Sequence, residues 1–436
     1  MRTVTDPLAR HDVEDERVEE ERVAERVVHG VWGLLLVVLG GAPVLYALVA
    51  RRPYTSAASP LVGAAGSTLT DPVRTLIAVL VTGTAVMVIV LALPVARLPR
   101  RGWTAVLGAL GLGAATALSA LAHRSPLGVG HLALPLMALA MALFPRPSRR
   151  WFERSFTLVL RVIVWGSLLA AAAFPGWAVQ QGYDSSFVGL GSRLAGLTPH
   201  ANALGPLAVV LVVLEWRRHP RHHLALAVAG AALFWTQSKT SWAALAVLVA
   251  VVAARRLRRE TPERTMLPVL VVAMVVGGSA WFALGLAAEG QDTFREDERA
   301  ESFTGRTSIW EVTLEVWQDD PLLGYGTNLW DDDMDRRYRY RVGFPPGHAH
   351  NQLIHTLGES GLAGAVPLVL LLIALGALAR RADGPTNGVA GALFLVLVAQ
   401  AFSEAPMQST PNGTNFLLLF GIVGYLLVAG NEVDDA

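Results

Sequence analysis

The sequence predicts an all-α polytopic membrane protein with about twelve transmembrane helices and one large extracytoplasmic loop that contains amphipathic helices. Of its 436 residues, 53% are hydrophobic and only 16% are charged. The mean hydropathy is +0.44. The apolar residues form runs of about 20, the length that crosses the hydrocarbon core of a bilayer. The charged residues gather between these runs, as they do in the loops of membrane proteins.

Twelve apolar runs are candidate spans. The sixth to eighth are short and closely spaced, so their borders are the least defined. The runs cover residues 28–50, 75–96, 103–122, 126–144, 157–178, 200–216, 222–237, 239–254, 267–287, 353–379, 386–403 and 412–430.

The loop charges predict the sidedness of these spans. With the amino terminus inside, the inner loops hold 17 Arg or Lys residues and the short outer loops hold six. Because excess Arg marks cytoplasmic loops, both termini are expected on the cytoplasmic side of the membrane. The basic residues are almost all arginine, which together with the Ala, Val and Gly content indicates a GC-rich bacterial genome and hence a bacterial cytoplasmic (inner) membrane. The resulting units are a charged cytosolic tail (1–27), spans one to nine (28–287), an extracytoplasmic catalytic loop (288–352), spans ten to twelve (353–430) and a cytosolic carboxyl terminus (431–436).

Composition excludes several function classes. The chain has no cysteine, so disulfides, thiolate metal sites and cysteine nucleophiles are excluded. No basic groove with interleaved aromatic residues indicates nucleic acid, and no glycine-rich loop indicates a nucleotide. We therefore expect no cofactor and no nucleic-acid partner. The tail 1–27 is too charged for a signal peptide and is interpreted as a solvated segment, with an interaction arm as the alternative.

The long outer loop contains a predicted amphipathic helix, "GRTSIWEVTLEVWQ". Thr304 is the expected N-cap, and "DDPLLGYG" is expected to end the helix. Such a helix would lie along the membrane surface with Trp310 and Trp317 at headgroup depth. One helical face is formed by Ile309, Thr313, Val316 and Trp317.

Two cations on the outer side are candidate anion ligands. Lys239 is the only lysine of the chain, and a snorkelling side chain is the alternative to an anion site. Arg306 lies in the first turn of the predicted helix, where unpaired N–H groups favour anions. Together the two residues are a candidate clamp for a diphosphate. Polar donors near the lysine are Gln237, Ser238, Thr240 and Ser241.

The stretch "GHAHNQLIHTLGESG" brings histidines to the start of a span. His348 and His350 could hold zinc, but with no HExxH motif and no carboxylate at ligand spacing we expect no metal site. His350, followed by Asn351, suits a general base or a polar contact to a substrate hydroxyl. His355 and Glu359 are four residues apart, on one helix face, and are expected to satisfy each other.

Other polar residues belong to the outer edge or to spans. "GLGSRLAGLTPHANALG" brings Arg193, His200 and Asn202 to the outer edge. Within predicted spans, His131 is expected to make a helix-packing contact. Arg161, near an inner end, is expected to snorkel.

Four segments occur in a telling order: "RLAGLTPHANALG", "QSKTSWAALAVL", "GRTSIWEVTLEVWQDDPLLGYGTN" and "HAHNQLIHTLGESGLAG". In order, spacing and sidedness they resemble the O-antigen ligase and polysaccharide polymerase family of bacterial membrane glycosyltransferases. The resemblance covers roughly residues 189–380, and the twelve-span plan matches along the whole chain.

The resemblance implies a metal-independent, inverting glycosyl transfer at the outer face of the membrane. The donor would be a glycan on undecaprenyl diphosphate, and the acceptor a sugar hydroxyl on a glycan or lipid-linked glycan. By motif match, the family's two donor-binding basic residues fall on Lys239 and Arg306, and its histidine beside the reacting hydroxyl falls on His350. Arg193, Asn202, His348, Asn351 and Glu359 are expected to support them. The family normally has arginine where this chain has Lys239, which keeps the charge but loses the bidentate fork.

Three other interpretations stay open. A polysaccharide flippase or transporter also has about twelve spans, but more often shows internal repeats and broken or charged helices near the midplane. A protein O-oligosaccharyltransferase of the same fold would use a Ser, Thr or Tyr acceptor. A scaffold without activity is the third. The sequence does not separate ligase from polymerase, nor does it give the sugar or the oligomeric state.

Overall fold

The fold is known from a computed structural model. It describes residues 7–49, 70–94, 102–181, 191–216, 223–260, 303–327, 329–330, 334, 347–407 and 414–432. Its elements are α1 (Pro7–Val49), α2 (Thr70–Ala92), α3 (Trp103–His123), the 3-10 helix η1 (Val129–Leu132), α4 (Ala133–Leu143), α5 (Arg149–Ala173), α6 (Pro175–Ala178), β1 (Val179–Gln181), β2 (Ser192–Leu194), α7 (Ala201–Trp216), α8 (His223–Thr236), α9 (Lys239–Glu260), α12 (Phe303–Asp319), α14 (Gln352–Ala382), α15 (Val389–Ser403) and α16 (Thr414–Glu432).

The fold is that of a multi-pass helical membrane protein. Six described helices are long and apolar enough to cross a bilayer, and five shorter apolar helices accompany them. Every predicted span coincides with one of these helices except 267–287, which lies outside the described residues. The count of twelve spans therefore stays a prediction. In the tail 1–27, helix α1 begins already at Pro7.

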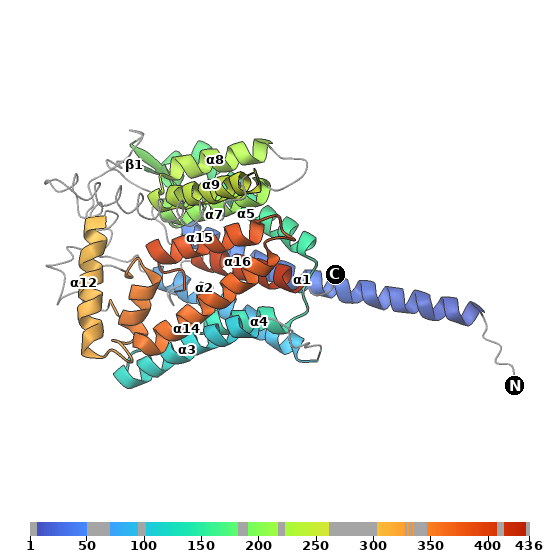
Figure 1. The fold of residues 1–436 in the computed structure, drawn as a ribbon, viewed down its shortest axis with the longest axis horizontal. Helices are drawn as coiled ribbons and strands as arrows, with labels where there is room; N and C mark the ends of the chain where they lie inside the picture. The colour runs from blue at the N-terminus through green and yellow to red at the C-terminus, as the bar shows by residue number, and fades with distance from the viewer. Residues whose placement is uncertain are drawn as a thin grey trace.

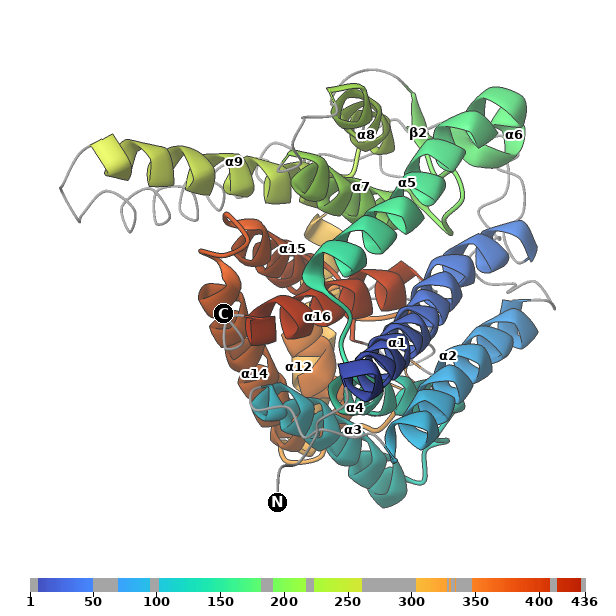
Figure 2. The same ribbon diagram turned by 90° about the vertical axis from the view of Figure 1, so that its right-hand side faces the viewer.

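The helices pack around α16, which lies at the middle of the bundle (Figure 2). In its apolar window, 89% of the residues are buried, against half or less in the other long spans. Leu and Phe residues cover all sides of α16, so it has apolar neighbours in every direction. This central helix ties the amino-terminal and carboxyl-terminal helices into one core.

The bundle has two distinct ends. Helix α12 lies across one end, and the first turns of α1 extend from the opposite end (Figure 1). Loops predicted on the same side of the membrane contact each other. The Arg149 side chain donates to the carbonyl of Pro385 at 2.7 Å, and the Thr327 hydroxyl donates to the carbonyl of Pro126 at 2.8 Å. The first contact joins two predicted inner loops and the second joins two predicted outer loops.

One expected surface arginine is paired inside the protein. Arg161 was expected to snorkel, but its Nε lies 2.5 Å from Oε1 of Glu215, which is fully buried on α7. A buried carboxylate without a partner is strongly destabilising, and the guanidinium of Arg161 neutralises the carboxylate of Glu215 on α7. The pair accounts for Arg161 within the protein, and the snorkelling of its 24% exposed side chain stays a prediction.

Helix α12 confirms that the predicted amphipathic segment is helical, with one correction; its place on the outer side stays a prediction. Its buried face contains Ile309, Thr313 and Val316, and it ends at Asp319, just before the predicted turn. However, the helix begins at Phe303, so Thr304 lies inside its first turn and is not the N-cap. The indole N–H groups of Trp310 and Trp317 donate to the carbonyls of Ala349 (2.7 Å) and Pro321 (3.0 Å). Their expected position at headgroup depth stays a prediction.

Candidate active site

Glu404, at the end of α15, is the centre of a polar cluster at the α12 end of the bundle. One carboxylate oxygen, Oε2, lies 2.9 Å from Nε2 of His348 and 3.0 Å from Nδ1 of His350. The other oxygen, Oε1, lies 3.4 Å from Nη2 of Arg306. The two imidazole rings are 4.0 Å apart. Three segments that are distant in sequence thus bring two imidazoles and a guanidinium to one carboxylate.

The turn that carries the histidines is fixed by its neighbours. Asn351 is the N-cap of α14, since its Oδ1 accepts from the N–H of Ile354 at 3.1 Å. Its Nδ2 donates to the carbonyl of Phe402, two residues before Glu404, at 3.1 Å. His350 itself has a left-handed backbone with φ of 48°. Such a conformation is costly for a residue other than glycine and persists where the surroundings impose it, often at functional sites.

Helix α12 positions Arg306, whose side chain is 5% exposed. The apolar face of the helix packs on the segments around the histidines, and the indole of Trp310 donates to the carbonyl of Ala349, between the two histidines. Arg306 therefore does not reach the site on a flexible arm. The helix that holds it is bonded directly to the histidine turn.

A break in α14 adds a second connection between the two helices. Ser360 and Gly361 have non-helical backbone angles, so the carbonyls before the break and the N–H groups after it need other partners. The segment 320–326 supplies them. Four backbone hydrogen bonds bridge the break: Tyr325 N–H to Gly358 O (2.7 Å), Gly326 N–H to Glu359 O (3.0 Å), Leu362 N–H to Pro321 O (2.9 Å) and Ala363 N–H to Leu322 O (3.0 Å).

This bridge explains two glycines of the family-like motifs. Gly361 has φ of 58°, and a Cβ there would lie 2.3 Å from the carbonyl oxygen of Leu322. Gly324 has φ of 73°, and a Cβ there would lie 2.7 Å from the carbonyl oxygen of Gly358. Only glycine combines such backbone angles with such close approach. The segment "PLLGYG" therefore does more than follow the end of α12, because its backbone hydrogen-bonds to α14 on both sides of the break.

The charges of the cluster favour a neutral imidazole beside an ionised carboxylate. Burial, and next the neighbouring His348, lower the pKa of His350 to about 4 although Glu404 opposes the shift. Burial would raise the pKa of Glu404, but its contacts with His350 and His348 and the charge of Arg306 hold that pKa well below its usual range. An ionised carboxylate only accepts hydrogen bonds, so Nδ1 of His350 carries the proton and Nε2 carries the lone pair. This is the tautomer that a general base needs.

The sequence analysis missed Glu404. It found no carboxylate at ligand spacing from the histidines, but this carboxylate comes from a segment 54 residues beyond His350. A signal was available, because Glu404 is the only charged residue between 384 and 431 and it lies at the predicted outer end of a span. Its oxygen and the two imidazole nitrogens lie within 4.8 Å of one another, a spacing that metal ligands can have. In this structure the three groups satisfy each other by hydrogen bonds, with a guanidinium as the counter-charge.

Lys239 lies at the start of α9, beyond the turn that follows α8. The residues expected to support it hold this turn. Arg193 is buried on β2, donates through Nε to the carbonyl of Thr236 at 3.0 Å and contacts the side-chain oxygen of Asn202. Because β1, the partner of β2, lies at the same end of the bundle as α12 (Figure 1), Lys239 is at the correct end for a shared site. Its place beside the donor diphosphate stays a prediction.

His355 and Glu359 contact each other, as expected from their spacing, with Nε2 and Oε2 3.5 Å apart. They lie beyond the start of α14, away from the contacts of Glu404. A third residue joins them that was expected only to pack between helices: Nε2 of His131 lies 3.8 Å from Oε1 of Glu359.

Comparisons with known proteins agree with the resemblance found in the sequence. The helical bundle with a polar site at one end defines a multi-pass membrane protein. A family model described as O-antigen ligase matches residues 224–369. This match covers about a third of the chain and marks the region as similar to O-antigen ligases. The match includes Lys239, Arg306 and the two histidines of the cluster, but not Glu404.

The chain is also similar to the exopolysaccharide production protein ExoQ of Rhizobium meliloti (strain 1021). The two are 29% identical over 163 residues, which is 35% of this chain and 35% of that protein. The chain thus aligns with about a third of the length of this relative.

Proposed function

We propose that this protein is a membrane glycosyltransferase that transfers or polymerises glycan from an undecaprenyl-diphosphate-linked donor. The acceptor is a sugar hydroxyl at the outer face of the cytoplasmic membrane, and the reaction is inverting and metal-independent. The observation that carries the proposal is the Glu404–His350 pair next to Arg306, at the α12 end of the bundle. The O-antigen ligase match and the similarity to an exopolysaccharide production protein support the substrate class.

The pair supplies the base of the reaction. Nδ1–H of His350 donates to Glu404, so Nε2 is able to take the proton of an acceptor hydroxyl as that oxygen attacks the anomeric carbon. Glu404 also stabilises the imidazolium that forms. A positioned base contributes ~10²–10⁴-fold to the rate of such a step.

The cations stabilise the leaving group of the reaction. The bond between the anomeric carbon and the diphosphate breaks while the new glycosidic bond forms, and negative charge grows on the leaving lipid diphosphate. The guanidinium of Arg306 stabilises that charge, with Lys239 as the proposed second cation. The donor carries its own activation, so the chemistry needs neither a nucleotide nor a further cofactor.

The break in α14 is a feature that the sequence analysis associated with transporters. Here the backbone groups at the break are satisfied by the chain's own segment 320–326. A polysaccharide flippase remains the alternative that an assay must separate. A protein O-oligosaccharyltransferase differs only in its acceptor.

The test uses the purified protein in lipid with a lipid-diphosphate-linked oligosaccharide, alone and with glycan, lipid-linked glycan or peptide acceptors. We expect transfer by the wild type and its loss in His350→Ala and Arg306→Ala. His123→Ala is the matched control, because His123 also lies at the α12 end and contacts a carboxylate, with Nε2 3.4 Å from Asp320. A ladder from donor alone identifies a polymerase, and a single transfer to a separate acceptor identifies a ligase. Movement of the donor across the membrane without any transfer would refute the proposal.

A further inference from the structure

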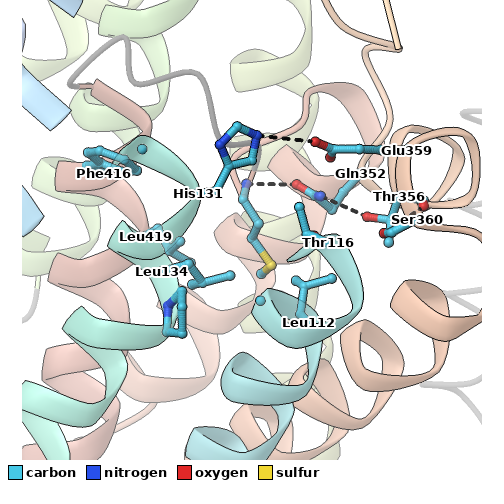
Figure 3. A pocket seen from close by; sticks show the side chains of 14 residues that line it. Leu112, Thr116, His131, Leu134, Gln352, Thr356, Glu359, Ser360, Phe416 and Leu419 are labelled. Atoms are coloured by element: carbon cyan, nitrogen blue, oxygen red, sulfur yellow. Dashed lines mark hydrogen bonds and ion pairs between the residues drawn. The ribbon is translucent and has the colours of Figure 1, made fainter. Parts of the chain in front are cut away.

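A second titratable cluster lies inside the bundle, apart from the contacts of Glu404. The carboxyl group of Glu359 stands between two imidazoles, 3.8 Å from Nε2 of His131 and 3.5 Å from Nε2 of His355. Glu359 and His355 are buried. Figure 3 shows His131 and Glu359 pointing toward each other across a cavity. The proposed function uses none of these three side chains.

The cavity is small and partly polar. Its volume is about 30 Å³, which is room for about one or two water molecules. Polar groups on its wall come from Thr116, Gln352, Thr356 and Ser360, and apolar groups from Leu134, Met407 and Phe416. These polar groups supply the roughly two to four partners that a buried water needs, so the cavity is suited to hold water.

The cluster lacks a fixed positive charge. Among the described residues that line the cavity there is no arginine or lysine. Within the described part of the chain, Nε2 of His131 and Nδ1 of His355 have no hydrogen-bond partner. The carboxyl and the imidazoles are also too far apart for strong direct hydrogen bonds. An ionised carboxylate enclosed in this way would be costly, so the carboxyl group of a membrane helix takes up a proton unless a cation neutralises it.

We propose that His131, Glu359 and His355 form a buried proton-binding site. One proton is shared between the carboxyl group of Glu359, the imidazole of His355 that contacts it directly, and the imidazole of His131 on the wall of the same cavity. His131 comes from η1, and the other two residues come from α14. The remaining walls, from α3, α16 and the segment after Glu404, contribute no titratable side chain among the described residues. Among the described residues that line the cavity, only His131 and Glu359 are titratable, and His355 contacts Glu359 directly. The charges of His348 and His350 act on His355 from the candidate active site.

The location gives this site a use, which rests on the proposed function. In each transfer the acceptor O–H bond breaks, the proton goes to Nε2 of His350, and the diphosphate leaves with its bonding electron pair. The imidazolium must then lose that proton before the next cycle. Glu359 and His355 lie on the first turns of the helix that begins two residues after His350, and Gln352 lines the cavity while its Oε1 accepts from the N–H of Met407 at 2.7 Å. With Glu359 protonated at rest, the unprotonated imidazoles of the cluster are the groups that take up the proton that the base releases, and His355 lies five residues after His350.

Infrared spectroscopy of the purified protein in lipid tests the site without any activity. At neutral pH we expect the carbonyl band of a protonated carboxylic acid, shifted by exchange into D₂O and absent in Glu359→Gln. Glu311→Gln is the control, because Glu311 is exposed on α12 and should leave the band unchanged. His131→Gln should move the band without removing it. A wild-type spectrum without the band, a band that survives Glu359→Gln, or a band that disappears on adding Na⁺ would overturn the proposal, the last in favour of a cation site.

A kinetic measurement tests the use of the site. In Glu359→Gln we expect kcat to fall by about tenfold with an unchanged KM for the donor, since proton release and not binding is affected. An unchanged kcat would overturn the role as a proton store. If the wild type shows the infrared band but no glycosyl transfer at all, the proposed function fails while the proton-binding site stands.

Discussion

Replacement of Glu404 by glutamine tests the candidate active site most directly. The substitution preserves the shape of the side chain but removes its charge, and its NH₂ group can face Nδ1 of His350, now 3.0 Å from the carboxylate. A donor in that position favours the tautomer with the proton on Nε2, which takes the lone pair away from the acceptor hydroxyl. The glutamine would also no longer stabilise the imidazolium.

The expected loss follows from these two effects. Removal of a working base costs up to ~10²–10⁴-fold. Some molecules retain the productive tautomer, so we expect kcat to fall by roughly 10²–10³-fold, which corresponds to about 2.7–4 kcal/mol of transition-state stabilisation. The donor KM should hardly rise, because Arg306 keeps its charge and loses its counter-ion. Glu404→Asp keeps the charge on a shorter side chain and should recover part of the rate.

The assay is steady-state transfer from a lipid-diphosphate-linked oligosaccharide by protein in lipid, with Glu311→Gln as a charge-matched control on α12. Thermal unfolding of each variant separates a local effect from loss of the fold. If Glu404→Gln keeps more than about a third of the wild-type kcat and folds normally, Glu404 does not set the tautomer of His350, and the base must be sought elsewhere.

Three further outcomes are expected. Burial and His348 lower the pKa of His350 to about 4, so the imidazole stays neutral in mild acid. We therefore expect kcat/KM to stay level down to about pH 5 and to fall with a midpoint near pH 4. A midpoint near the ordinary histidine pKa of about 6.5 would contradict this. Gly361→Ala places a Cβ 2.3 Å from a carbonyl oxygen of the bridging segment. We expect kcat to fall at least tenfold and the melting temperature to drop. Gly230→Ala is the control and should behave as wild type, because a Cβ there has no atom within 4 Å. Lys239→Ala should raise the donor KM about tenfold or more and Lys239→Arg should not, and equal donor KM values in both variants would remove Lys239 from the donor site.

The sequence was sufficient for features that depend on local composition. Apolar runs of membrane-spanning length coincide with helices, and the amphipathic pattern around Ile309 and Val316 predicts which face of α12 is buried. Arg306 and His350 were identified as candidates from ordered motifs, and the structure brings both to the same carboxylate.

Features that depend on pairing between distant segments could not be obtained in this way. The partner of His350 is Glu404, which follows a different span, and no local pattern links the two. The break in α14 has only Ser360 and Gly361 as a local sign, and its bridging segment precedes it by about 40 residues. His131 was assigned to packing for the same reason, because its partner Glu359 is remote in sequence.

The contacts that hold His350 and Arg306 in place indicate which residues select the acceptor. His350 is held by the N-cap of α14, by the carbonyl bond to Trp310 and by Glu404. Arg306 is held by α12, and the segment that follows this helix bridges the broken α14. With His350 as the proposed base and Arg306 as the proposed cation, both held in this way, we expect ligase and polymerase activity to differ in the residues that border the acceptor. Exchange of those residues between related proteins should change the acceptor and leave the effect of Glu404→Gln intact.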